Sequence, residues 1–263
     1  MKQKIIYNIS ILVFAITFLH TSCRNNKTVQ TFLLKDLAPV VMEYKGKEVF
    51  QYWEFENKPF LWGTVLGQVI AMKSYKDSLE LELGTESFRQ VVEKEASQNN
   101  SLDTLYSENG DLINAQLVHS GNVGKIRTIN FLEAELLNYQ LIRYPLLSHP
   151  TEFHGFILLH DSLNDVRVYF AASDQPWPPK PKVILESIKK DLKQGWKLKY
   201  HLHNHYEPKS RNYIGILAPS LADAQYYKFL SEDFDLENAI ITNGFHTVEI
   251  ESKEFSKFKA HGN

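Results

Sequence analysis

The chain has 263 residues, of which 43% are hydrophobic, 13% aromatic and 23% charged, and this composition excludes a disordered, collagenous or low-complexity protein. Its 29 basic and 31 acidic residues give a formal net charge of -2, so we expect no basic surface for a phosphate backbone and no nucleic-acid partner. The single cysteine excludes an internal disulfide framework, a cysteine-based zinc knuckle and a Cys-x-x-Cys redox pair.

Residues 1–22 have the pattern of a secretory signal peptide, in which a basic start and a short apolar run lead into small residues. The following cysteine, Cys23, completes the segment Leu19-His20-Thr21-Ser22-Cys23, which resembles a bacterial lipobox. This resemblance implies that Cys23 is acylated and becomes the mature N-terminus. We therefore expect a membrane-anchored lipoprotein of the bacterial cell envelope, on the periplasmic or outer-membrane side. The alternatives are an ordinary signal peptide with an incidental cysteine, or an uncleaved anchor.

Removal of residues 1–22 would leave 241 residues (263 minus 22) with a formal charge of -4 (27 minus 31). Residues 23–36 are predicted to be a lipidated tether, and residues 37–128 an N-terminal α+β segment. Leucine and glutamate alternate over residues 79–83, which favours a half-exposed strand, and a helix is predicted over residues 85–96. No group of residues in this half suggests a chemical role.

Residues 129–255 are predicted to form a second domain, in which strands and helices mix without a regular βαβ repeat. Its first helix begins with a capping box, Asn130 with Glu133. The later signals, in chain order, are a hairpin over 155–170, an exposed proline-rich loop at 174–181, a helix from 184 to 192, a strand over 196–205, a helix from 220 to 230 and an Asn-Gly hairpin over 239–250. The predicted class is α/β (α+β), with a mixed sheet flanked by helices.

Histidine is the residue type that suggests chemistry, because seven of the ten histidines fall between residues 149 and 246. His201, His203 and His205 alternate along the predicted strand and project from one face. Two such histidines can hold one metal ion, and a catalytic zinc site needs a third ligand and an open position for water. The alternation leaves two possible pairs, His203 with His205 at the end of the strand and His201 with His203.

Asp223 is the candidate for the third ligand, three residues after Ser220 at the predicted start of a helix. The same Ser-x-x-Asp spacing is also an ordinary capping arrangement, in which Ser220 is the N-cap and the helix dipole favours Asp223. From these two residues alone, the capping interpretation and the metal-site interpretation both remain open.

His203-x-His205 followed by Ser220-x-x-Asp223, with Glu152 ahead of a core strand, resembles the JAMM (MPN+/JAB) metallopeptidase family over about residues 129–252. The resemblance implies a cytidine deaminase-like fold and a Zn2+ ion bound by the two histidines and the aspartate. It further implies that Glu152 holds the catalytic water and that Ser220 stabilises the oxyanion. Tyr206 stands where the family has proline.

The family resemblance implies a zinc hydrolase of amide or isopeptide bonds that acts on a peptide or protein substrate. The fourteen residues between His205 and Ser220 are about twice the usual family gap, so residues 206–219 are expected to be an insertion at the rim of the site. The alternative function is a non-catalytic lipoprotein that keeps the fold as a binding or scaffold module. Glu152 also has a plain interpretation, as an exposed acid near a turn.

Overall fold

The structure is a computed structural model. It describes residue 34 and residues 38–44, 47–71, 75–96, 109–144, 146–172, 181–206 and 213–261. Met1–Leu37 and Ala38–Asn263 are two separate units, and the following description concerns the second. The signal peptide, the lipobox and Cys23 lie outside the described residues. Among the helices that are described, none has the length and apolarity needed to cross a membrane.

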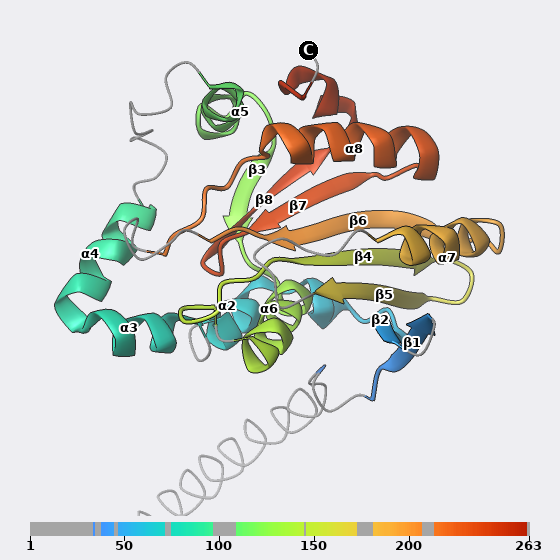
Figure 1. Cartoon of the computed structure of the whole chain (residues 1–263), viewed down its shortest axis with the longest axis horizontal. Helices are drawn as coiled ribbons and strands as arrows, with labels where there is room; N and C mark the ends of the chain where they lie inside the picture. Colours follow the sequence, from blue (N-terminus) through green and yellow to red (C-terminus); the bar gives the residue numbers. More distant parts are fainter. Residues whose placement is uncertain are drawn as a thin grey trace, which may run out of the picture. The chain divides into compact units, whose positions relative to one another are not determined.

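An eight-stranded mixed sheet forms the centre of this unit, with the order β1-β2-β5-β4-β6-β7-β8-β3 (Figure 1). The strands are β1 (Val40–Tyr44), β2 (Lys47–Glu56), β3 (Lys125–Thr128), β4 (Phe153–His160), β5 (Asp165–Ala172), β6 (Lys197–Asn204), β7 (Asn238–Thr242) and β8 (His246–Glu251). All neighbours are antiparallel except β6 and β7, which are parallel. A parallel pair needs a crossover connection, and here the crossover contains a helix, α8 (Leu221–Phe234).

Helices cover both faces of the sheet (Figure 1). The other α-helices are α2 (Thr64–Ala71), α3 (Asp77–Leu83), α4 (Thr85–Ala96), α5 (Gly110–His119), α6 (Phe131–Arg143) and α7 (Lys182–Leu192), with 3-10 helices η2 (Pro59–Trp62) and η6 (Ser252–Lys257). The main core joins α7, α8 and η6 to one sheet face through buried side chains such as Ile188, Tyr227 and Phe255. On the other face, α6 packs with α2. The predicted mixed sheet flanked by helices is confirmed.

The two predicted parts of the mature chain contribute to one sheet. Strands β1, β2 and β3 come from residues 37–128, and the remaining strands come from residues 129–255. β2 pairs with β5, and β3 pairs with β8 at the opposite side of the sheet. The N-terminal segment therefore supplies both edge strands.

The strand predicted over residues 79–83 is wrong, because these residues lie in helix α3. Leu79 is fully buried while Leu81 is 89% exposed, so these two leucines do not share one face as alternate residues of a strand would. Leucine and glutamate both favour helices, and five alternating residues are too few to override that preference. Gly84, with φ of +79°, ends the helix in a conformation that suits glycine.

Most local signals of the second half are confirmed, while residues 174–180 of the predicted proline-rich loop lie outside the described residues. Asn130 and Glu133 form the capping box of α6. The hairpin of β4 and β5 and the helix α7 occur at the expected places. The Asn-Gly hairpin joins β7 to β8, and a Cβ at Gly244 would lie 2.4 Å from Cδ1 of Tyr75. The hairpin therefore needs glycine at this position, where φ is +84°.

Candidate metal centre

The end of β6 presents the alternating histidines toward α8. His201 and His203 are 1% and 2% exposed, and His205 follows directly after the strand. The backbone N–H of His205 donates to the carbonyl of Thr242 over 2.8 Å, which continues the pairing of β6 with β7. The Nε2 atoms of His203 and His205 are 2.9 Å apart. The strand therefore aims two imidazole nitrogens at one point.

Asp223 reaches the same point from the start of α8. Its Oδ1 lies 3.5 Å from Nε2 of His203, and its Oδ2 lies 3.4 Å from Nε2 of His205. One potential ligand atom from each of these three residues lies within 4.8 Å of the others. In the described part of the chain, no other group of three or more histidine, cysteine or acidic residues places its ligand atoms this close together.

Ser220 and Asp223 also form a complete capping box at the N-terminus of α8. Oδ2 of Asp223 accepts from the backbone N–H of Ser220 over 2.9 Å and from its hydroxyl over 2.7 Å, while Oγ of Ser220 accepts from the N–H of Asp223 over 3.1 Å. Oδ1 is left to face His203. The capping and metal-site interpretations are therefore compatible, because the cap fixes the carboxylate in place.

Each of these histidines is held at its second ring nitrogen. Nδ1 of His205 lies 2.8 Å from the carbonyl oxygen of Ile216, and Nδ1 of His203 lies 3.1 Å from the hydroxyl of Tyr227. A partner at one ring nitrogen fixes the ring orientation and the tautomer that the other nitrogen offers. Both rings consequently direct Nε2 toward Asp223.

The expected insertion contributes to this support. Of residues 206–219, the structure describes Tyr206 and 213–219, and Tyr206 forms an isolated bridge with Ile214. A Cβ at Gly215 would lie 2.3 Å from the carbonyl carbon of His205, so the chain can pass there only as glycine. The side chain of Asn243 donates to the carbonyl of Gly215 over 3.2 Å. This segment thus lies directly against the histidines.

Glu152 lies at the start of β4, which pairs with β6 so that His154 is opposite His203. The ladder ends at this pair, two residues from Glu152 and two from His205, and the negative charge of Glu152 acts on His205, whose pKa it helps to raise. Asn204 holds the backbone on both sides of Glu152: its Oδ1 accepts from the N–H of Phe153 over 3.0 Å, and its Nδ2 donates to the carbonyl of Thr151 over 3.1 Å.

His201 is engaged elsewhere and is not part of the three-residue cluster. Its Nε2 lies 2.8 Å from Nδ1 of His154, and both rings contact Tyr226. Burial lowers the pKa of both histidines, with a further contribution from neighbouring histidines, to about 3 for His154. The geometry therefore favours His203 with His205 over the alternative pair of His201 with His203.

Electrostatics divide the histidines of this face into two kinds. Burial disfavours a charge on His205, but the hydrogen bond and negative charge of Asp223 outweigh it and raise the pKa of His205 to about 9, with help from Glu152 and the Ile216 carbonyl. Burial also opposes ionisation of Asp223, yet His203 and His205 hold the pKa of Asp223 well below its usual range. A positive ion at this point would replace the proton that the site now favours.

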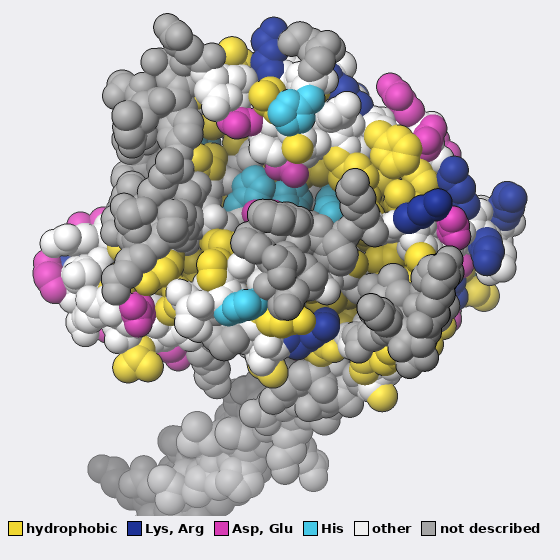
Figure 2. Space-filling view, in the orientation of Figure 1, with side chains coloured by type: hydrophobic (Ala, Val, Ile, Leu, Met, Phe, Trp, Pro, Cys, Tyr) yellow, Lys and Arg dark blue, Asp and Glu magenta, His cyan; other side chains and the backbone are white. Residues whose placement is uncertain are grey.

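The proposed ligands differ in exposure: the His203 side chain is 3% exposed, whereas those of His205 and Asp223 are 16% and 24% exposed. Figure 2 shows histidine side chains grouped in a hollow of the surface, with acidic side chains above them and hydrophobic side chains to the right. Tyr226 and Phe229 stack with ring centroids 6.0 Å apart on α8, and Phe229 is 38% exposed. We call the surroundings of His203, His205 and Asp223 the histidine hollow.

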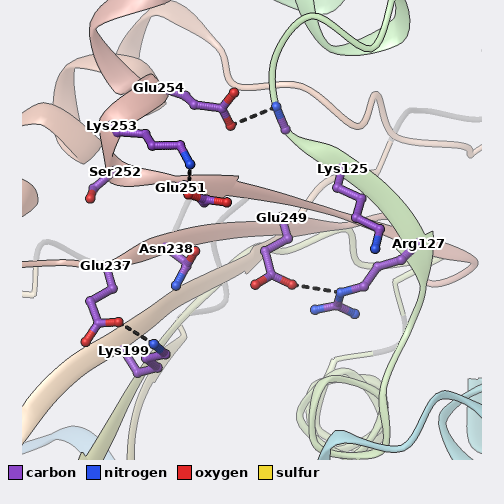
Figure 3. Close-up of a pocket in the computed structure, with 11 residues that line it drawn as sticks. Lys125, Arg127, Lys199, Glu237, Asn238, Glu249, Glu251, Ser252, Lys253 and Glu254 are labelled. Carbon is purple, nitrogen blue, oxygen red and sulfur yellow. Dashed lines mark hydrogen bonds and ion pairs between the residues drawn. The ribbon is translucent and has the colours of Figure 1, made fainter.

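A second hollow, of about 670 Å³, lies over β3, β6 and β8 (Figure 3). It is lined by Gly124, Lys125, Arg127, Lys199, Glu237, Asn238, Glu249, Glu251, Ser252, Lys253 and Glu254. Its acids have partners: Glu237 pairs with Lys199, Glu251 with Lys253 and Glu249 with Arg127, and Glu254 accepts from the N–H of Gly124. Val248 and Ile250 lie in the α8 core, so Glu249 and Glu251 project from the opposite sheet face.

Comparison with family models, with curated proteins and with solved structures finds no match for this chain. The functional interpretation consequently rests on the residues and their geometry.

Of the five site residues predicted from the sequence, the structure brings His203, His205, Asp223 and Ser220 together. The fifth, Glu152, directly precedes β4 and acts on His205 through its charge. Sequence analysis did not predict every supporting residue. It did not single out Tyr227, Asn204, His154 or the Ile216 carbonyl. Two of these had a usable signal: Tyr227 is four residues after Asp223 on one helix face, and His154 shares a strand face with Glu152. The carbonyl of Ile216 had none, because backbone groups carry no sequence signature.

Proposed function

We propose that the protein is a zinc-dependent hydrolase of amide or isopeptide bonds, with His203, His205 and Asp223 as the metal ligands. The observation that carries this proposal is the convergence of two Nε2 atoms and one carboxylate on a single point. Two ligands of one tetrahedral zinc, each at 2.0–2.1 Å, are roughly 3.3 Å apart. The two Nε2 atoms here are 2.9 Å apart, and each lies within 3.5 Å of one of the two Asp223 carboxylate oxygens, Oδ1 for His203 and Oδ2 for His205. The donor set and its spacing therefore fit zinc.

Zinc with three protein ligands supplies Lewis acidity and lowers the pKa of bound water toward ~7. The part that remains for the protein is proton transfer. We assign this to Glu152, whose carboxylate would accept a proton from water and give it to the leaving amine. Glu152 suits this role because Asn204 fixes the backbone on both sides of it, and because its charge contributes to the raised pKa of His205.

Ser220 is the proposed donor to the developing oxyanion. Its hydroxyl hydrogen points at Asp223 in the present arrangement. To stabilise an oxyanion, the hydroxyl would exchange this carboxylate for the substrate oxygen, while the backbone N–H of Ser220 keeps Asp223 in place. The capping box thus holds the ligand by two bonds, of which one can be released.

The assignment agrees with the order of residues in the JAMM family and with the mixed sheet flanked by helices. The proposed substrate is a peptide or protein, and the proposed location is the cell envelope, with a lipid at Cys23. A non-catalytic binding module is the second candidate, because the capping box alone accounts for Ser220 and Asp223 without any chemistry.

Glu152→Gln distinguishes the two candidates. The full chain, purified in detergent without chelators, should hold about one zinc per molecule by elemental analysis. Glu152→Gln keeps the size of the side chain but cannot accept a proton at neutral pH, so its zinc content and melting temperature should match wild type. Hydrolysis in a screen of isopeptide and short peptide amides should fall by roughly 10²- to 10⁴-fold.

Absence of metal from the wild-type protein would overturn the proposal. Loss of zinc in Glu152→Gln would make Glu152 a ligand instead of a base. Full turnover by this variant would place the base elsewhere, and turnover by no form of the protein would favour the binding module.

A further inference from the structure

Tyr227 lies one helical turn after Asp223, on the same face of α8. Its side chain is fully buried, and its hydroxyl lies 3.1 Å from Nδ1 of His203. Its ring packs against Phe255, with centroids 5.5 Å apart. One stretch of helix thus brings both a proposed ligand and a hydroxyl to the two sides of the same histidine.

The two proposed histidine ligands are held by different kinds of partner. Nδ1 of His205 faces a carbonyl oxygen, which can only accept, so this nitrogen must carry a hydrogen and Nε2 is the atom left for a metal. Nδ1 of His203 faces a hydroxyl, which can accept or donate. His203 can bind a metal through Nε2 only in the tautomer that carries its hydrogen on Nδ1.

We propose that Tyr227 is a positioning residue that accepts a hydrogen bond from Nδ1–H of His203 and thereby holds Nε2 of His203 toward Asp223. This inference rests on the proposed function, because it gives His203 the role of a metal ligand. The fixed ring of Tyr227, packed against Phe255, keeps the oxygen where Nδ1 needs an acceptor. Tyr227 acts on the site through His203 and does not itself touch the metal position.

The neighbouring residue supplies a matched control. Tyr226 is also on α8 and contacts His201 and His154 by its ring, but its buried hydroxyl has no hydrogen-bond partner in the described structure. Tyr226→Phe and Tyr227→Phe each remove one buried oxygen from adjacent positions. Only the second removes a hydrogen bond to a proposed ligand.

Zinc affinity of the full chain, measured by competition with a chromogenic chelator, tests the proposal. Loss of a partner behind a histidine ligand typically weakens metal binding by about 10- to 100-fold, and we expect this for Tyr227→Phe. Tyr226→Phe should bind zinc like wild type. The absorption spectrum of bound Co2+ should also change in Tyr227→Phe and not in Tyr226→Phe. Equal zinc affinity and equal cobalt spectra in the two variants would overturn the proposal.

Nitrogen-15 NMR of the histidine rings separates this inference from the proposed function. In metal-free protein, the Nδ1 resonance of His203 should move in Tyr227→Phe and stay in place in Tyr226→Phe. A wild-type protein that binds no metal would contradict the proposed function. An Nδ1 resonance of His203 that does not move in Tyr227→Phe would contradict the role of Tyr227. If Tyr227→Phe does not fold, the wild-type spectra test the proposal instead. They should show a hydrogen on Nδ1 of His203 that lies close to the ring protons of Tyr227. A His203 ring without a hydrogen on Nδ1 would overturn the proposal.

Discussion

The two hollows of this protein differ in how their polar groups are satisfied. The hollow over β3, β6 and β8, called the charged hollow below, is lined by four acidic and four basic side chains. Its acids are paired with cations or with a backbone N–H. In the histidine hollow, three groups aim potential ligand atoms at one point. Their remaining atoms are held by the cap of α8, by Tyr227 and by a backbone carbonyl.

The convergence of potential ligand atoms, and not the number of charges, distinguishes the histidine hollow. A paired surface charge contributes little to binding or stability and needs no ligand. Three potential ligand atoms within 4.8 Å of one another form an arrangement that a metal ion would complete. We therefore expect substitutions in the histidine hollow to affect metal content, and substitutions in the charged hollow to leave metal content unchanged.

Substitution of the proposed ligands should have the largest effect. His203→Ala, His205→Ala or Asp223→Ala should each abolish tight zinc binding, because three protein ligands are the minimum for a stable site. His201→Ala is the control from the same strand, and it should retain zinc because His201 is bonded to His154. Elemental analysis of the four variants checks this. Zinc lost in His201→Ala but kept in His205→Ala would move the ligand pair back by two residues.

The candidate site could be predicted from sequence because its residues follow local rules. Strand alternation places His203 and His205 on one face, and a helix start fixes the spacing of Ser220 and Asp223. The distance between these two groups is not local, because β6, α8 and β7 must fold as one crossover to bring them together. The family resemblance supplied that step, and periodicity alone could not have done so.

The parts of the fold that sequence missed depend on packing and long-range pairing. The alternation at residues 79–83 was compatible with a strand or a helix, and burial of Leu79 beside Val91 and Phe245 accompanies the helical form. The pairing of β3 with β8 joins residues more than 100 positions apart, and no local pattern indicates it. For the same reason, the contribution of residues 37–128 to both sheet edges was not foreseen.

In the charged hollow, substitution of Arg127 should have the second-largest effect, on the free energy of unfolding. Its guanidinium pairs with Glu249 and also with Glu133, which is 1% exposed inside the α6 capping box. Arg127→Met would leave the Glu133 carboxylate buried without its cation, which typically costs about 3–5 kcal/mol. Urea unfolding of the metal-free protein should show this loss, while zinc content stays at the wild-type value.

Lys125→Ala is the control for Arg127→Met on the same strand. Lys125 is exposed and makes no ion pair among those described, so its removal should change the free energy of unfolding by no more than about 0.5 kcal/mol. Loss of zinc in Arg127→Met would show that the two hollows are coupled, which contradicts the distinction drawn between them.

The pH dependence of stability is the third and smallest expected effect, and it arises from the histidine hollow. In metal-free protein the pKa of His205 is about 9 against an ordinary 6.5, so the folded state holds this proton more tightly than the unfolded state. Its contribution is complete below pH 6.5 and is lost as the pH rises toward 9, by up to about 3 kcal/mol. The pKa of His154 is lowered to about 3, so stability should also fall as the pH drops below 6.5. Metal-free protein should therefore be most stable near pH 6.5.

Urea unfolding in the presence of a chelator, repeated across this pH range, checks the expected maximum. His205→Gln removes the group with the raised pKa, so it should flatten the alkaline side and leave the acidic side, to which His154 contributes. With zinc in excess, the alkaline side should reverse, because zinc competes with the proton on His205 and binds more tightly as the pH rises. A wild-type stability that is constant between pH 6.5 and 9 without metal would show that Asp223 does not hold a proton on His205.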